Sequence, residues 1–223
     1  MKRKVTAALS VLLTLCMLLP LCGQALQVQL PEVTESNSSP YADPVLGYSF
    51  RIPDYLTPLP EEYEKLLLDE QNKEKEFGDE EWHYDVQAWF TPVSSGEMLF
   101  FEVTLKKCSN ESFENEVAQA PYYAENAQKQ FSEAGRDAHI NMLHDGILRE
   151  TPAGQMLEIA VIQEETLEDG TQSSELFIYY DFYCNTIEYI FALTAPSRLV
   201  SYESMQKLLD SIVNTAEIQH VLE

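Results

Sequence analysis

The side chains of this sequence that could do chemistry are few, and their spacing matches no known catalytic pattern. The four histidines are His83, His139, His144 and His220. His139 and His144 lie five residues apart in a segment patterned as a strand, so their rings point to opposite faces and cannot hold one ion. The chain has no HExxH, GxSxG or phosphate-loop motif. We therefore assign no catalytic residue, no metal ligand and no cofactor from the sequence.

Carboxylates are present in excess, with 37 Asp and Glu residues. A pair of carboxylates can hydrolyse a glycoside without leaving a sequence motif, so this chemistry stays open. The densest acidic run, residues 69–81, holds seven acidic residues and two lysines. The run lacks the Asp-x-Asp-x-Asp-Gly pattern of a calcium loop, and it favours the solvated face of a helix.

Two of the four cysteines, Cys108 and Cys184, lie beyond the apolar N-terminal segment. Outside the cytoplasm such a pair can form a disulfide, and this one would close a long loop. Neither cysteine lies beside a histidine or in a metal-binding spacing, so a thiol nucleophile is not expected. The sequence leaves two outcomes open, a Cys108–Cys184 disulfide or two unreacted thiols.

Residues 1–25 have the layout of a secretory signal peptide. A basic start, MKRK, precedes an apolar run that ends at Cys22, and the small residues Gly23 and Ala25 suit cleavage after Ala25. One alternative is a lipid anchor on Cys22, which the shapes of Pro20 and Leu21 disfavour. Another is an uncleaved anchor, for which the apolar run is short. We expect a secreted or cell-envelope protein with no membrane span after processing.

The formal net charge of the chain is −23 at pH 7. Removal of the signal peptide would leave 11 Lys and Arg against 37 Asp and Glu, a formal −26. Such a surface repels nucleic acid and anionic lipid, so nucleic-acid binding is excluded. One interpretation of this charge is that acidic residues spread along the chain keep an exported protein soluble and monomeric. Attraction of cationic peptides, polyamines or divalent ions is the functional alternative.

The chain beyond the signal peptide divides into a linker, one domain and a short tail. Residues 26–44 contain three prolines and a Ser/Asn cluster, which predict a flexible linker. Residues 45–218 are aromatic-rich and evenly patterned, and their length suits one domain with a sizeable core. Residues 219–223 form the tail.

Hydrophobic patterning within the domain predicts strand, acidic helix, hairpin, helix, four-strand meander and helix, in that order. Two-residue alternation predicts strands within residues 48–52, 84–90, 99–105, 140–150, 156–165, 175–183 and 186–194. A period near 3.6 predicts helices within residues 61–77, 117–134 and 201–215. Strands joined by tight turns are antiparallel. The predicted fold class is α+β, a mainly antiparallel sheet with helices packed on it.

The last strands of the meander carry most of the strand aromatics. Alternation turns one set of apolar residues toward the core and leaves four on the opposite face: Phe177, Tyr179, Asp181 and Tyr183. We expect a second helix layer to bury these four residues. If no helix covers them, they form an aromatic and acidic surface suited to cationic or peptide-like partners.

Several segments, taken in order, resemble PsbP-like domains. The opening GYSFRIPDYL resembles their strand entry, and YYAENAQKQFSEAG, the meander from LRETPAGQMLEIAVIQ to TIEYIFALTAP, and LLDSIVNTAEI follow in the same order. This fold is shared by a Ran-binding nuclear factor and by many exported bacterial proteins. The resemblance implies an α/β/α sandwich over residues 45–218.

For function, the resemblance implies a non-catalytic binding or assembly accessory of the cell envelope. Its partner would be an unidentified protein or small ligand, and the protein would be a monomer. Docking to a photosystem is not implied, because the chain has few basic residues. The competing hypothesis is a carboxylate-dependent extracellular hydrolase that acts on wall or dietary polymers.

Overall fold

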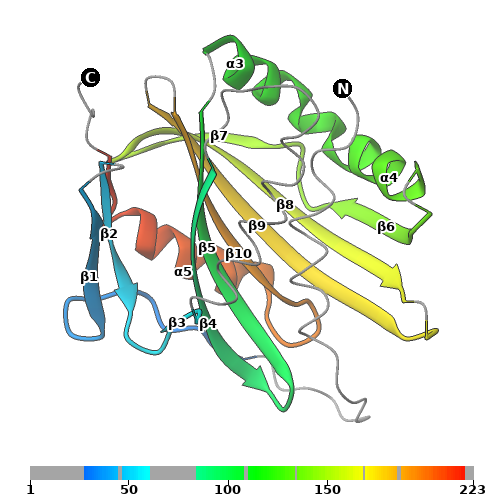
Figure 1. The fold of residues 1–223 in the computed structure, drawn as a ribbon, viewed down its shortest axis with the longest axis horizontal. Helices are drawn as coiled ribbons and strands as arrows, with labels where there is room; N and C mark the ends of the chain where they lie inside the picture. The colour runs from blue at the N-terminus through cyan, green and yellow to red at the C-terminus, as the bar shows by residue number, and fades with distance from the viewer. Residues whose placement is uncertain are drawn as a thin grey trace.

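The computed structural model describes residues 28–44, 47–60, 84–107, 110–133, 135–167, 169–184 and 187–218. The expected signal peptide with Cys22, the expected acidic helix, His83, Cys108 and the tail with His220 lie outside the described residues. Within them, an antiparallel sheet carries helices, as the predicted α+β class requires (Figure 1).

A large antiparallel sheet forms the centre of the domain. Its hydrogen-bonded order is β3-β4-β5-β10-β9-β8-β6, and β7 pairs with a separate length of β8. The strands are β3 (Thr57–Pro58), β4 (Tyr84–Ser94), β5 (Glu97–Lys107), β6 (Asp137–Met142), β7 (Ile147–Thr151), β8 (Gly154–Thr166), β9 (Gln172–Cys184) and β10 (Ile187–Pro196). The predicted hairpin is β4–β5, and β8, β9 and β10 follow as consecutive antiparallel neighbours. Pairing of β10 with β5 joins the two groups of strands.

The larger core lies on one face of this sheet, beneath α5 (Tyr202–Val213). Helix α5 begins after Ser201, whose side-chain oxygen accepts a hydrogen bond from the Ser204 backbone N–H at 3.2 Å. Of the residues that the 3.6-residue period placed on its inner face, Tyr202 is half-buried and five are buried: Met205, Leu208, Leu209, Ile212 and Val213. The sheet contributes Tyr180 and Phe191, both 0% exposed, from the face that alternation assigned to the core.

Helical segments cover the opposite face of the sheet, over a smaller core that includes Phe131 and Phe177. These segments are α3 (Asn110–Gln119), the 3-10 turn η2 (Ala120–Tyr122) and α4 (Tyr123–Glu133). We expected a single helix over 117–134, and that expectation was wrong. Pro121 has no backbone N–H and its ring crowds the preceding turn, so the α-helix stops and restarts there.

Residues 28–44 pack against the domain, so the expectation of a flexible linker over 26–44 was wrong for them. The backbone N–H of Val28 donates to the carbonyl of Leu199 at 2.7 Å, and Leu30 is buried. Strand β1 (Ser38–Asp43) pairs with β2 (Tyr48–Pro53), and β11 (Glu217–Ile218) completes this small sheet. The polar sequence SSPYAD of β1 shows no apolar alternation that could have predicted a strand.

The strand expected over 140–150, with a kink or bulge at Gly146, is two strands, β6 and β7, joined by a loop that contains His144. Gly146 in this loop has a φ of 85°, a conformation that glycine adopts without strain. A Cβ atom at Gly146 would lie 2.7 Å from the Cβ of Ala120. The loop therefore packs directly on η2.

No helix within the described part of the chain is long and apolar enough to cross a membrane.

Candidate functional site

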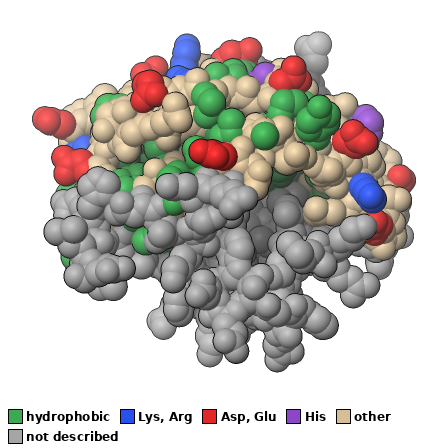
Figure 2. Space-filling view, turned by 90° about the horizontal axis from the view of Figure 1, so that it is seen from above, with side chains coloured by type: hydrophobic (Ala, Val, Ile, Leu, Met, Phe, Trp, Pro, Cys, Tyr) green, Lys and Arg blue, Asp and Glu red, His purple; other side chains and the backbone are tan. Residues whose placement is uncertain are grey.

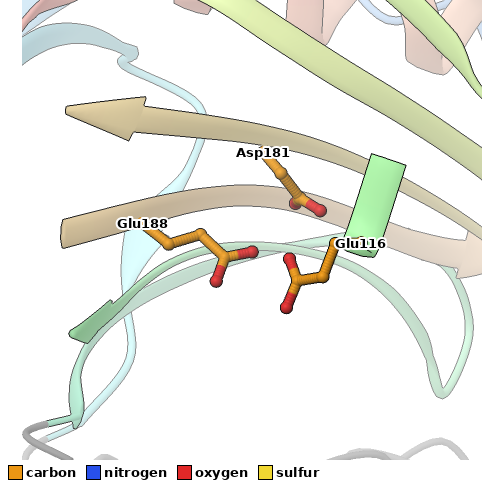
Figure 3. Close-up of side chains that lie close together, drawn as sticks. All are labelled: Glu116, Asp181 and Glu188. Carbon is orange, nitrogen blue, oxygen red and sulfur yellow. The ribbon is translucent and has the colours of Figure 1, made fainter. Parts of the chain in front are cut away.

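Three carboxylates converge between the helix layer and the sheet. Glu116 comes from α3, Asp181 from β9 and Glu188 from β10 (Figure 3). One oxygen atom from each carboxylate lies within 4.8 Å of the other two. Asp181 is 8% exposed, Glu188 is 1% exposed and Glu116 is half-buried. We call these three residues the carboxylate cluster.

Strand register and one aromatic contact bring the carboxylate cluster together. Asp181 lies opposite Ile190 and Glu188 lies opposite Tyr183, so both acids occupy the sheet face beneath α3 and α4. The ring of Phe113 on α3 stacks on the Tyr183 ring, with centroids 5.5 Å apart. Glu116 follows Phe113 by about one helical turn and so lies over the same part of the sheet.

Two tyrosines border the carboxylate cluster. The hydroxyls of Tyr123 on α4 and Tyr179 on β9 share a hydrogen bond, and their ring centroids are 6.4 Å apart. Burial, and to a smaller extent the nearby negative charge of Asp181, raise the pKa of Tyr123 to about 12, although the hydrogen bond to Tyr179 acts in the opposite direction. Burial also raises the pKa of Tyr179, so both hydroxyls stay protonated at neutral pH.

A fourth acid, Glu102 on β5, lies on the same sheet face. Glu102 is opposite Ala192 of β10, and Ala192 is opposite Tyr179 of β9, so one strand separates the two side chains. Burial raises the pKa of the Glu102 carboxyl group to about 7. The negative charge of Glu102 in turn raises the pKa of Tyr179. The described acidic side chains of this region are therefore poorly hydrated, and the strand register places Lys106 of β5 opposite Glu188.

The carboxylate cluster offers oxygen donors only, which are the ligands that hard divalent cations prefer. Three carboxylates at this separation repel one another, and a cation placed between them would offset that repulsion. Neither of the two histidines in the described residues contributes, because His139 is an exposed residue of β6 and His144 contacts Glu158 elsewhere.

The four residues expected on the second sheet face do occupy that face. Phe177 and Asp181 are buried, and Tyr179 and Tyr183 are half-buried. Of these four, only Asp181 belongs to the carboxylate cluster. Half-buried Cys184 ends β9, and Cys108, its candidate disulfide partner, lies outside the described residues, so the choice between a disulfide and two thiols stays open.

Glu116 and Glu188 were not selected from the sequence. The signal that could have found Glu188 is an acidic residue at an inward position of an apolar strand, as in TIEYIF. The same signal marks Glu102 in LFFEVTL and Asp181 in YYDFY. A charged residue at such a position costs free energy unless a partner or a ligand compensates it.

A second polar cluster lies on the other sheet face, around Glu158 of β8. Glu158 is 0% exposed and accepts hydrogen bonds from Arg149 at 2.7 Å, Tyr202 at 2.5 Å and Gln206 at 2.9 Å. His144 Nε2 lies 3.2 Å from the same carboxylate. Four side chains from β7, α5 and the β6–β7 loop therefore surround one buried charge.

Asp210 on α5 completes this second cluster. It accepts hydrogen bonds from the Tyr180 hydroxyl at 2.6 Å and from Arg149 Nη2 at 3.1 Å. Burial and the neighbouring carboxylates raise the pKa of Tyr180 and Tyr202, which keeps both hydroxyls as donors. Because the carboxylates are satisfied by side chains of the protein, we assign this cluster a structural role.

No protein-family model matches the chain, and no curated protein matches it in sequence. Among solved structures, it is similar to the solution structure of cyanobacterial PsbP (CyanoP) from Synechocystis sp. PCC 6803. The TM-score is 0.50 at 10% identity, over 86% of this chain and 98% of that one. The fold is PsbP-like.

A crystal structure from Bacteroides thetaiotaomicron VPI-5482 also matches, with a TM-score of 0.40 and 11% identity. That match covers 84% of this chain and 50% of the other. At these identities the likeness to the PsbP structure establishes the PsbP-like fold alone, and function has to be argued from the site.

Proposed function

We propose that this protein is an exported, non-catalytic accessory protein of a bacterial cell envelope that binds a hard divalent cation in the carboxylate cluster. One observation carries the proposal. Carboxylates from three elements have oxygens within 4.8 Å of one another, and two of these acids are 8% and 1% exposed. The signal-peptide layout of residues 1–25 supports export.

The chemistry of the donors selects the class of ion. Carboxylate oxygens suit Ca²⁺, Mg²⁺ and Mn²⁺, whereas Zn²⁺ sites usually include nitrogen or sulfur ligands. A bound divalent ion would cancel most of the negative charge that Glu116, Asp181 and Glu188 bring together. It would also link α3 to β9 and β10, because its ligands come from both layers. Binding would therefore stabilise the packing of α3 on the sheet.

Burial of Asp181 and Glu188 disfavours the carboxylate cluster as the active site of the hydrolase alternative. A glycosidase places two carboxylates on either side of the bond to be cut, so a polymer must reach both of them. Asp181 and Glu188 lie beneath the helix layer and are nearly inaccessible to solvent. A polymer chain could reach them only if α3 moved away from the sheet.

Titration calorimetry on the purified full-length protein, freed of metal with a chelator, tests the proposal. We expect Ca²⁺ to bind with one site per chain and to raise the melting temperature, because the ion binds the folded state alone. Glu188→Gln keeps the size of the side chain and removes its charge, so it should abolish the heat of binding. No Ca²⁺, Mg²⁺ or Mn²⁺ binding to the wild type would contradict the proposal.

Helix α3 provides a matched control for the titration. Glu116 belongs to the carboxylate cluster, whereas Glu114, two residues earlier, is exposed. Glu116→Gln should weaken Ca²⁺ binding at least about tenfold, which corresponds to the loss of roughly 1.4 kcal/mol. Glu114→Gln should leave binding unchanged. Equal effects of both changes would indicate a diffuse electrostatic attraction in place of a site.

Release of reducing sugar from peptidoglycan or plant polysaccharides tests the alternative. We expect no release by the wild type. Release that Asp181→Asn abolishes, while Glu114→Gln leaves it intact, would favour the hydrolase.

A further inference from the structure

Strand β7 lies at an edge of the large sheet, beside apolar side chains that are exposed to solvent. Within the described residues β7 pairs with β8 alone, so one side of the strand presents backbone N–H and C=O groups. Four large hydrophobic residues of the described chain are exposed, and all lie in or near β7: Tyr122 (55%), Leu143 (39%), Ile147 (38%) and Leu148 (47%). An apolar edge of this kind favours pairing with another strand.

The ladder register places Ile147 and Leu148 on opposite faces of the sheet. Ile147 is paired with Glu158, which lies on the α5 face, and Leu148 is paired with Leu157, which belongs to the smaller core. The edge of β7 is thus apolar on both sides.

Ile147 and Leu148 each share their face of the sheet with one further exposed hydrophobic residue. The Leu143 N–H donates to the carbonyl of Ala160 at 2.9 Å, and Ala160 belongs to the core beneath α5, so Leu143 shares the face of Ile147. Tyr122 belongs to η2, against which the loop before β7 packs through Gly146 and Ala120. Tyr122 therefore lies on the side of the sheet that carries Leu148.

Exposed acids surround this edge. Asp145 precedes β7, Glu150 lies within it, and Glu125 lies on α4 shortly after Tyr122. Figure 2 shows the side of the molecule that carries β7 and α3, with hydrophobic side chains among acidic ones and few Lys or Arg. The positive charge of Arg149 does not offset the negative charge of these exposed acids, because Glu158 and Asp210 already bind its guanidinium group. This charge favours a basic partner and repels both anionic lipid and a second copy of the chain.

We infer that β7 accepts an extended peptide segment of a partner protein, with small apolar residues and flanking Lys or Arg, as an added strand. Main-chain hydrogen bonds to β7 supply affinity, and side chains that alternate between the two faces supply specificity. On one face they meet Ile147 and Leu143, and on the other they meet Leu148 and Tyr122. The ion pairs of Arg149 fix β7 in place before binding, which lowers the entropy lost on association.

Synthetic peptides titrated into the full chain test this inference without knowledge of the natural partner. The probe is a fluorescent Lys-Val-Ala-Val-Ala-Val-Lys peptide, compared with Glu-Val-Ala-Val-Ala-Val-Glu. Two further versions of the lysine peptide carry backbone N-methyl groups at odd or at even positions. We expect the lysine peptide to bind and the glutamate peptide to fail. One N-methyl series alone should lose binding, because alternate N–H groups of an added strand point toward β7.

Leu148→Asp should weaken the binding of the lysine peptide about tenfold or more, because it removes apolar contact area at the edge. Leu167, half-buried in the turn between β8 and β9, is a control distant from the edge, and Leu167→Asp should leave binding unchanged. Melting curves of both variants show that each is folded. Failure of the lysine peptide to bind, equal binding of the two N-methyl series, or equal effects of the two substitutions would overturn the inference. So would binding of phosphatidylglycerol vesicles, or a dimer that Leu148→Asp dissociates, without peptide binding.

Discussion

Arg149 and Glu158 form an ion pair whose two ends lie in different environments. Arg149 Nη1 donates to Glu158 Oε2 at 2.7 Å, and the side chain of Arg149 is 35% exposed whereas that of Glu158 is 0% exposed. Tyr202 and Gln206 donate to the other oxygen of Glu158. The buried carboxylate therefore joins β7, β8 and α5, and water cannot replace a donor that is lost.

Arg149→Met should destabilise the protein strongly, because it leaves the charge of Glu158 buried without its cationic partner. Breaking a buried pair from one side costs about 3 kcal/mol or more. Urea denaturation followed by circular dichroism at pH 7 measures this loss as a fall in the free energy of unfolding.

Arg198→Met is the matched control. Arg198 also pairs with a glutamate, Glu97, but its side chain is 52% exposed. Exposed pairs contribute about 1 kcal/mol or less. Similar small losses in both variants would show that Glu158 does not depend on Arg149.

Gly146→Ala should destabilise the protein by about 3 kcal/mol. The φ of 85° strains any side chain, and the added Cβ would lie 2.7 Å from Ala120 Cβ. Gly170→Ala measures the cost of the positive φ without a close contact, because Gly170 has a φ of 82° and nothing lies within 4 Å of an added Cβ. We expect a loss of about 1 kcal/mol there. Equal melting temperatures for the two variants would contradict close packing of the loop on η2.

Glu102 should make the stability of the protein depend on pH. Burial raises its pKa from 4.5 to about 7 in the folded state, so the folded chain holds a proton that the unfolded chain releases. Stability due to this group therefore falls as the pH rises from about 4.5 to about 7, and then stays level. Glu102→Gln cannot ionise, and it should flatten that part of the stability profile.

Urea denaturation at pH 5, 6, 7 and 8 measures the effect of Glu102→Gln. The exposed Glu114 provides the control, and Glu114→Gln should retain the slope of the wild type between pH 5 and pH 7. A slope in Glu102→Gln equal to that of the wild type would assign the pH dependence to other groups.

Local pattern predicted those parts of the fold that depend on neighbouring residues. Two-residue alternation assigned Tyr180 to the core and Tyr179 to the opposite face, and the structure places both rings there. The 3.6-residue period found the inner face of α5. The break at Pro121 could also have been predicted from the sequence, because a proline inside a helical pattern interrupts the helix.

Contacts between separate segments of the chain could not be predicted from the local sequence pattern. Strand β1 has no apolar alternation that would have indicated its pairing with β2. The carboxylate cluster joins Glu116 with acids that lie more than 60 residues later in the chain. Only the packing of α3 over β9 and β10 selects these three acids from the 37 in the sequence.

The most direct test of cation binding is a crystal structure of the full chain grown with Mn²⁺, with anomalous difference density recorded at the manganese edge. Binding in the carboxylate cluster predicts one peak between Glu116, Asp181 and Glu188, about 2 to 2.6 Å from oxygens of each, the range typical of hard divalent cations. Density at exposed acids, with none between these three residues at saturating Mn²⁺, would contradict it.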